Sequence, residues 1–122
     1  MANDFKRFVK KDIGTGEGAS GSTVYTVPSS SSTAMESIVI GITIANKSTA
    51  GITCDVFLDA LGGASDDVYI VKDASIPAGS SLEVMAGNKL VLQNSGSAGD
   101  VLRVSASASN SADALVSVLE DV

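Results

Sequence analysis

The last third of the chain reads Ile76-Pro77-Ala78-Gly79-Ser80-Ser81-Leu82, then Lys89-Leu90-Val91-Leu92, then Gly99-Asp100-Val101-Leu102-Arg103-Val104, then Ala114-Leu115-Val116-Ser117-Val118-Leu119-Glu120. Short apolar runs alternate here with turns rich in Gly, Ser and Ala. Runs of this length and spacing are typical of the strands of a small all-β sandwich. No residue pattern in these runs indicates a reaction centre.

The same pattern extends outward over the rest of the chain. Alternating or β-branched runs predict strands over residues 5–9, 23–27, 37–46, 52–58, 68–76, 81–85, 89–93, 101–106 and 114–119. We therefore expect an all-β fold: a single antiparallel β-sandwich or flattened barrel, jelly-roll or immunoglobulin-like, of seven to nine short strands. A weak helix over residues 111–119 is the alternative interpretation of the last run.

The alternation also predicts pairings and a core. We expect residues 37–46 and 52–58 to form one hairpin, and residues 81–85 and 89–93 to form another. The residues expected in the core are Ile38, Ile40, Ile42, Ile44, Cys54, Val56, Leu82, Leu102, Val104, Val116 and Val118. With 44% apolar residues but only 4% aromatic ones, this core consists of small aliphatic side chains.

Charge divides the chain into two parts. Residues 1–12 contain four basic and two acidic side chains, whereas the remaining residues contain four basic and twelve acidic ones. We therefore predict an N-terminal docking arm over residues 1–12 and a β-sandwich domain over residues 13–122. The arm suits an acidic neighbour, although solvated charges are the alternative. The acidic body argues against nucleic-acid binding.

Candidate catalytic and metal-binding residues are few. The chain has one cysteine, Cys54, and no histidine, which excludes a disulfide within the chain and Ser–His or Cys–His catalysis. The Gly14–Gly18 run lacks the lysine and the following helix of a phosphate-binding loop. Asp66 and Asp67, with Asp55 and Asp59 upstream, offer carboxylates to calcium, but their spacing does not match an EF-hand. We expect no enzymatic activity, no cofactor and no metal.

Membrane association is not expected either. The longest strongly apolar stretch, residues 38–45, is too short to cross a bilayer, and the first residues are charged where a secretory signal would be apolar. We therefore expect synthesis in a cytoplasm.

A set of motifs in fixed order resembles a known family. The motifs are Met1-Ala2-Asn3-Asp4-Phe5-Lys6-Arg7-Phe8, Val24-Tyr25-Thr26-Val27-Pro28, Val39-Ile40-Gly41, Ile44-Ala45-Asn46, Tyr69-Ile70-Val71-Lys72, Ile76 to Leu82, Gly99-Asp100-Val101-Leu102 and Leu115 to Glu120. Over nearly its whole length the chain is similar to small β-sandwich structural proteins in the virions of tailed bacteriophages, especially marine phages of cyanobacteria. The loop over residues 62–67 is longer than that family leads us to expect.

The resemblance implies a virion structural protein without enzymatic activity, made in the host cytoplasm and assembled onto the particle. A capsid decoration or cement protein is the first expectation, and a neck, tail or fibre domain that mediates assembly or recognises a host surface or glycan is the alternative. The expected partners are the major capsid protein or another virion protein, and further copies of the chain, as a trimer. The candidate partner-binding residues are Phe5, Lys6, Arg7, Phe8, Lys10, Lys11, Phe57 and Tyr69.

Overall fold

The computed structural model describes residues 3–28, 35–61, 64–85 and 89–121. These residues form nine β-strands and two short 3-10 helices. The elements are β1 (Asn3–Lys10), η1 (Gly18–Ser20), β2 (Ser22–Thr26), β3 (Met35–Asn46), β4 (Ile52–Asp59), η2 (Ala64–Asp66), β5 (Val68–Ile76), β6 (Ser81–Glu83), β7 (Leu90–Asn94), β8 (Val101–Ala106) and β9 (Ala112–Asp121). No helix in the described part of the chain is long and apolar enough to span a membrane.

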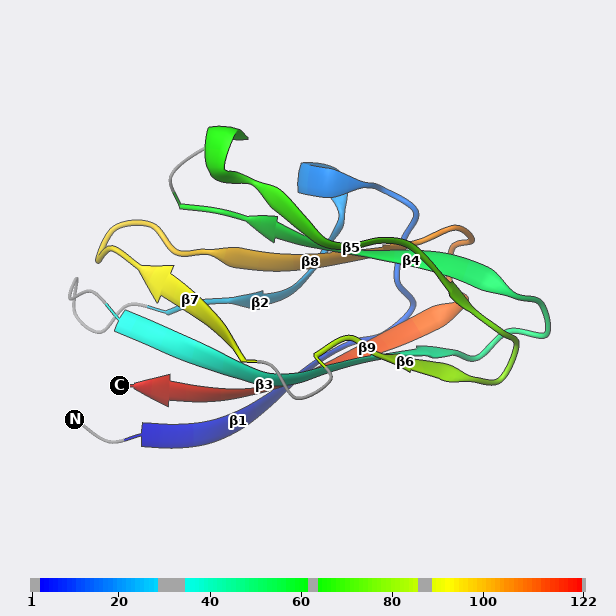
Figure 1. Cartoon of the computed structure of the whole chain (residues 1–122), viewed down its shortest axis with the longest axis horizontal. Coiled ribbons are helices and arrows are strands. Elements are labelled where there is room, and N and C mark those ends of the chain that lie inside the picture. Colours follow the sequence, from blue (N-terminus) through cyan, green and yellow to red (C-terminus); the bar gives the residue numbers. More distant parts are fainter. Residues whose placement is uncertain (1–2, 29–34, 62–63, 86–88, 122) are drawn as a thin grey trace.

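The strands form two antiparallel sheets that pack face to face as a β-sandwich (Figure 1). Sheet A has five strands in the order β1-β9-β3-β6, with β7 also paired to β3, and sheet B has four in the order β2-β8-β4-β5. The predicted sandwich is therefore confirmed, and the last apolar run is the strand β9 rather than a helix.

Both predicted hairpins are wrong. β3 pairs with β6, β7 and β9, whereas β4 pairs with β5 and β8, so the loop between β3 and β4 carries the chain from sheet A to sheet B. β6 and β7 do not pair with each other but lie against successive parts of β3. A short loop between two strands fits a crossing between sheets as well as a hairpin, because the alternation fixes which side chains face inward but not which strand is the neighbour.

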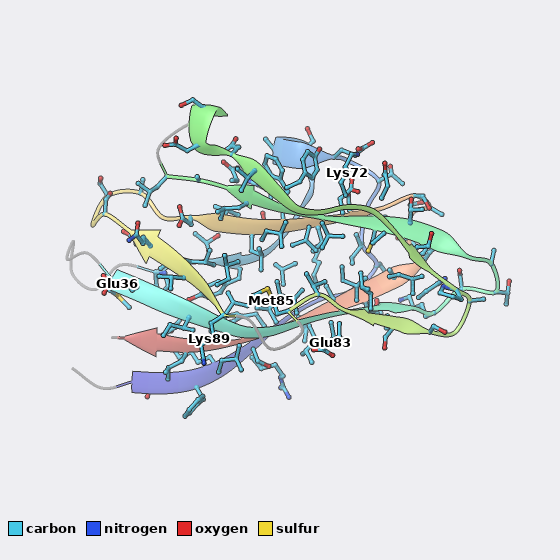
Figure 2. All side chains as sticks on the ribbon, viewed as in Figure 1. Glu36, Lys72, Glu83, Met85 and Lys89 are labelled. Atoms are coloured by element: carbon cyan, nitrogen blue, oxygen red, sulfur yellow. The ribbon has the colours of Figure 1, made fainter. Side chains whose placement is uncertain are left out.

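The core fills the space between the sheets with small aliphatic side chains, as Figure 2 shows. Most of the predicted core is confirmed, although Leu82 is only partly buried where it packs against the core. Two isoleucines of β3 depart from the prediction: Ile40 is 42% exposed and Ile38 is only partly buried. The cause is a β-bulge in β3: Val39 pairs with Val118 and Gly41 with Ser117, which leaves Ile40 as an extra residue. The inward-facing residues of β3 are therefore odd-numbered up to Val39 and even-numbered from Ile42 onward.

Candidate binding surfaces

The basic N-terminal segment is part of the sandwich. Asn3–Lys10 form the edge strand β1, paired along its length with β9. Because side chains alternate along a strand, Phe5 and Phe8 point to opposite sides of sheet A. Phe5 is 78% exposed, whereas Phe8 packs inward against Tyr25 with ring centroids 4.6 Å apart. The two rings therefore cannot contact the same surface of a partner.

The outer face of sheet A carries a row of apolar side chains across four strands. Phe5 lies opposite Leu119, Leu119 opposite Ile38, and Ile38 opposite Val91. Both ends of the row are exposed, Phe5 on β1 and Val91 on β7, with Val91 at 56%. Sheet faces of this composition are usually covered by another layer.

A second row runs parallel to the first. Val9 lies opposite Leu115, and Leu115 opposite Thr43. Val9 is 65% and Leu115 38% exposed. Between the two rows, the exposed Arg7 lies opposite Ser117. We call Phe5, Arg7, Val9 and Leu115, with the neighbouring Lys10 and Lys11, the β1 surface.

Two shallow grooves mark the β1 surface. One, of about 440 Å³, is lined mainly by apolar atoms and extends from Val9 and Leu115 to Ala45; its charged lining residues are Lys10, Lys11 and Asp113. The other, of about 320 Å³, lies between Phe5, Arg7 and Ile40. The β1 surface therefore combines apolar hollows with basic groups, which are the features of a protein-binding patch.

On its inner side, β1 is held by a buried carboxylate. Glu120 of β9 is 1% exposed, and its Oε1 lies 2.9 Å from the Nζ of Lys6. The hydroxyl of Tyr25 donates a 2.5 Å hydrogen bond to Oε2 of Glu120 and shares a 2.6 Å hydrogen bond with Ser37. Contact with Glu120 raises the pKa of Lys6, and burial raises the pKa of Tyr25 above its usual value. Lys6 therefore anchors β1 to the sandwich.

The end of β1 is fixed by a second cluster. Asp12 adopts a left-handed backbone conformation, with φ of 55°, and its N–H donates a 2.9 Å hydrogen bond to Oδ1 of Asp113. Lys47 pairs with both Asp12 and Asp113. Hydrogen bonding from the Asp12 N–H, together with Lys47, holds the pKa of Asp113 below its usual range. The turn from β1 into the body is therefore well defined.

The opposite edge of the molecule carries a second exposed patch. On β5, Val68 is 50% and Tyr69 42% exposed, and Asp66 at the end of η2 is exposed beside them. We call Asp66, Asp67, Val68 and Tyr69 the β5 surface. Phe57 is not part of it, because its ring is only 9% exposed.

Phe57, predicted as a partner-binding residue, is buried on the outer face of sheet B. Tyr69 packs on its ring at a centroid distance of 5.0 Å, and a Cβ placed on Gly18 of η1 would lie 3.9 Å from it. The short helix η1 therefore covers Phe57, so that it is not an exposed anchor. This cover could not be predicted from the sequence, because η1 comes from a loop that lies far from Phe57 along the chain.

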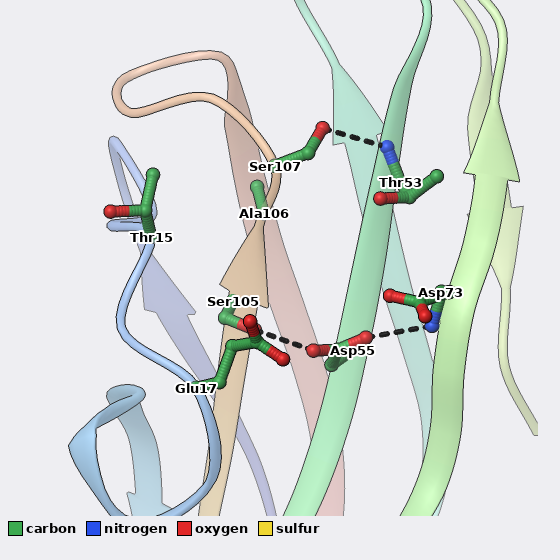
Figure 3. Close-up of a pocket in the computed structure, with 8 residues that line it drawn as sticks. All are labelled: Thr15, Glu17, Thr53, Asp55, Asp73, Ser105, Ala106 and Ser107. Carbon is green, nitrogen blue, oxygen red and sulfur yellow. Dashed lines mark hydrogen bonds between the residues drawn. The ribbon is translucent and has the colours of Figure 1, made fainter.

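A polar pocket of about 250 Å³ lies next to η1 on sheet B (Figure 3). Asp55, 5% exposed, accepts hydrogen bonds from the N–H of Asp73 at 2.7 Å and from the hydroxyl of Ser105 at 3.1 Å. Lys72 pairs with Asp55 at 3.3 Å and with Glu17. Burial opposes the ionisation of Asp55, but these three donors hold its pKa below the usual value. The polar groups of the pocket thus mostly satisfy one another.

Cys54 and Asp67 are the remaining residues that the sequence analysis considered for catalysis or metal binding. Cys54 is 1% exposed, and burial raises its pKa to about 11. Oδ1 of Asp67 accepts a 2.7 Å hydrogen bond from the N–H of Ala60. Among the described residues, no group of three or more acidic, cysteine or histidine side chains is placed to hold a metal ion.

Two buried carboxylates that bind groups on neighbouring strands, Glu120 and Asp55, were not predicted from the sequence. Glu120 follows Val116 and Val118 at the same inward-facing alternation, so the sequence pattern already placed a carboxylate in the interior.

Comparison of the chain with family models, with curated proteins and with solved structures gives no match.

Proposed function

We propose that this chain is a non-enzymatic structural protein of a tailed-phage virion, a capsid decoration or cement protein that stabilises the outer head shell. The observation that carries the proposal is the apolar β1 surface on sheet A, where Phe5 and Val9 are the most exposed large apolar side chains. The resemblance of the sequence to small virion proteins supports the same role. A compact sandwich with one adhesive face suits a protein that binds a preformed shell.

The proposed partner is the major capsid protein or another virion protein, with further copies of the chain as a trimer on the particle. Burying Phe5 and Val9 against the shell contributes on the order of 1.5–3 kcal/mol for each side chain. Arg7, Lys10 and Lys11 steer the encounter with an acidic neighbour. The proposal includes no nucleic acid, membrane, cofactor or metal.

The second candidate is a neck, tail or fibre domain that binds a glycan or a host surface. The polar pocket favours it, because Thr15, Thr53 and Ser107 present hydroxyls beside the carboxylates of Glu17 and Asp73. Copy number separates the two candidates. A cement protein is present at a copy number comparable with that of the shell protein, whereas a tail component is present in far fewer copies.

The test uses particles that lack the protein. Purified wild-type chain is added, the particles are sedimented, and bound protein is measured; Phe5→Asp and Leu115→Asp are compared with Thr49→Asp, at an exposed loop position. We expect both variants on the β1 surface to lose binding and Thr49→Asp to retain it, with all three showing the far-UV spectrum of the wild type. Undiminished binding by Phe5→Asp and Leu115→Asp would contradict attachment through this face. A reconstruction of the decorated particle then places the density on the head or the tail.

A further inference from the structure

We propose that an extended segment of the shell protein pairs with the free edge of β1, so that sheet A continues into the shell as one additional strand. This contact rests on the proposed function and specifies how the shell is held: through the backbone of β1 as well as through its side chains. The occupant of the edge is a single segment of the shell protein. Three features of β1 favour it: a regular edge, outward-facing backbone groups and exposed side chains beside them.

β1 is the one long and regular edge strand in the described part of the chain. Its eight residues pair with β9 in unbroken register, and β9 is the only described strand that pairs with it (Figure 1). β2 and β5, the edges of sheet B, both have register shifts, and Asp73 in β5 has a left-handed backbone with φ of 53°. β6 and β7 have only three and five residues. Short or irregular edges resist strand addition, whereas a long regular edge is a template for it.

Hydrogen bonds at the start of β9 show which backbone groups of β1 face the open edge. The carbonyl of Ala112 accepts the N–H of Ile13, on the β1 side, whereas the carbonyl of Ser111 accepts the N–H of Lys47, on the β3 side. Because backbone groups alternate between the two sides of an antiparallel strand, the even-numbered residues of β9 bond to β1. The register then directs the even-numbered residues of β1 to β9 and leaves the N–H and C=O groups of residues 5, 7 and 9 facing outward.

The side chains at the same three positions specify the segment. Phe5 and Val9 are largely exposed, each at the end of an apolar row on the outer face of sheet A. Arg7 lies between them, is exposed, and forms no ion pair with a described side chain. Cross-strand pairs stabilise a sheet when apolar side chains face each other and when opposite charges do. We therefore expect apolar, acidic and apolar side chains at alternate positions of the segment, a pattern that is the same in either strand direction.

A second copy of the chain is a poor occupant of this edge. An antiparallel pair of β1 strands would form its hydrogen bonds through the outward-facing residues of both copies. The two registers of greatest overlap then set Lys6 directly opposite Lys6, or Arg7 directly opposite Arg7. Like charges directly opposite each other destabilise a strand pair, so the charges of β1 favour an acidic segment instead.

Proline substitution tests the backbone contact, because proline has no N–H to donate. Arg7→Pro and Val9→Pro are compared with Arg7→Ala and Val9→Ala, which truncate the same side chains but keep the N–H. Each full-length variant is added to particles that lack the protein, and bound chain is measured by sedimentation over a range of concentrations. We expect each proline variant to bind at least about tenfold more weakly than its alanine partner, because a carbonyl of the shell segment loses its donor. Equal binding by the members of each pair would overturn the inference.

The fold of the variants and amide exchange provide independent checks. Both proline variants should keep the far-UV spectrum of the wild type, because an edge strand tolerates proline where the N–H faces outward. An unfolded proline variant would indicate that the N–H at its position bonds to β9, and would overturn the inference.

Amide exchange in D2O is read by NMR after the chain is released from the particle. In the free chain, the N–H groups of Phe5, Arg7 and Val9 should exchange faster than those of Lys6 and Phe8. On the particle, the same three groups should exchange at least about tenfold more slowly than in the free chain. Equal exchange on and off the particle would contradict strand addition.

The particle assay separates this inference from the proposed function. If both proline variants bind as their alanine partners do while Leu115→Asp fails to bind, strand addition is wrong and attachment through the outer face of sheet A stands. If the proline variants lose binding and the reconstruction places the density on the tail, the edge contact stands with a tail protein as its partner, and the cement role is wrong. If the wild-type chain does not bind the particles, both are wrong.

Discussion

The hydroxyl of Tyr25 donates a 2.5 Å hydrogen bond to Oε2 of Glu120, and this contact joins β2 of sheet B to β9 of sheet A in the interior of the sandwich. Lys6 reaches the other oxygen of the same carboxylate from β1. Three strands from both sheets thus meet at one buried charge, next to the inner side of the β1 surface. The geometry of that surface depends on this interior contact.

Tyr25→Phe tests the contact directly. The substitution removes the donor to a buried carboxylate, and we expect the free energy of unfolding to fall by about 1.5–3 kcal/mol. Urea unfolding followed by circular dichroism measures it. Tyr69→Phe is the matched control: the Tyr69 ring is 42% exposed, and its change should stay within about 0.5 kcal/mol. Equal losses in the two variants would show that the hydroxyl of Tyr25 contributes nothing specific.

The bulge in β3 predicts opposite results for two isoleucines on the same strand. Ile42 is fully buried, so Ile42→Asp places an unpaired charge in the core and should abolish folding. Ile40 is 42% exposed, so Ile40→Asp should remain soluble and unfold cooperatively. Thermal unfolding of both variants decides the matter. A folded Ile42→Asp or an unfolded Ile40→Asp would contradict the register on either side of the bulge.

Asp55 predicts a dependence of stability on acid pH. Its pKa in the folded chain is lower than the ordinary value of 3.8, so the unfolded chain binds the proton more tightly. The stabilisation is therefore complete above pH 3.8 and is lost as the pH falls through the lower, folded value. Asp55→Asn should flatten the loss of stability below pH 3.8, as measured by urea unfolding at a series of pH values. An unchanged slope in the variant would assign the acid sensitivity to other carboxylates.

Cys54 should be inert to thiol reagents in the folded chain. Its side chain is 1% exposed, and burial raises its pKa to about 11, so little thiolate is present and none is accessible. We expect labelling by a maleimide only in denaturant, with one label per chain. Rapid labelling without denaturant would show that β4 opens readily.

The strands could be predicted from the sequence because side-chain alternation is a local property. Ile42 and Ile44 were placed in the core correctly for this reason. The pairing of β3 with β9 was not predictable in the same way, since it joins residues far apart along the chain. The bulge at Ile40 depends on that pairing and was missed with it.

The candidate site was predicted in part. Residues 3–10 are the strand β1 of the sandwich rather than a separate arm. Phe5 and Arg7 are exposed, but side-chain alternation places Phe8 on the inner side of β1. That signal was available from the spacing of the two rings. The burial of Phe57 under η1 was not available, because no local pattern indicates which loop crosses over a sheet. Whether the surface residues bind a partner stays a prediction.

The position of β9 has a consequence for how the chain folds. β9 lies between β1 and β3, and the register of β1 pairs Asn3 with Asp121. Sheet A thus cannot close until β9 has been synthesised, and β1 stays without its partner strand while the ribosome makes more than a hundred intervening residues. Contacts of such long sequence separation slow folding and leave strand edges open meanwhile. Closure of the last strand against the first therefore completes the adhesive face and the fold in the same step.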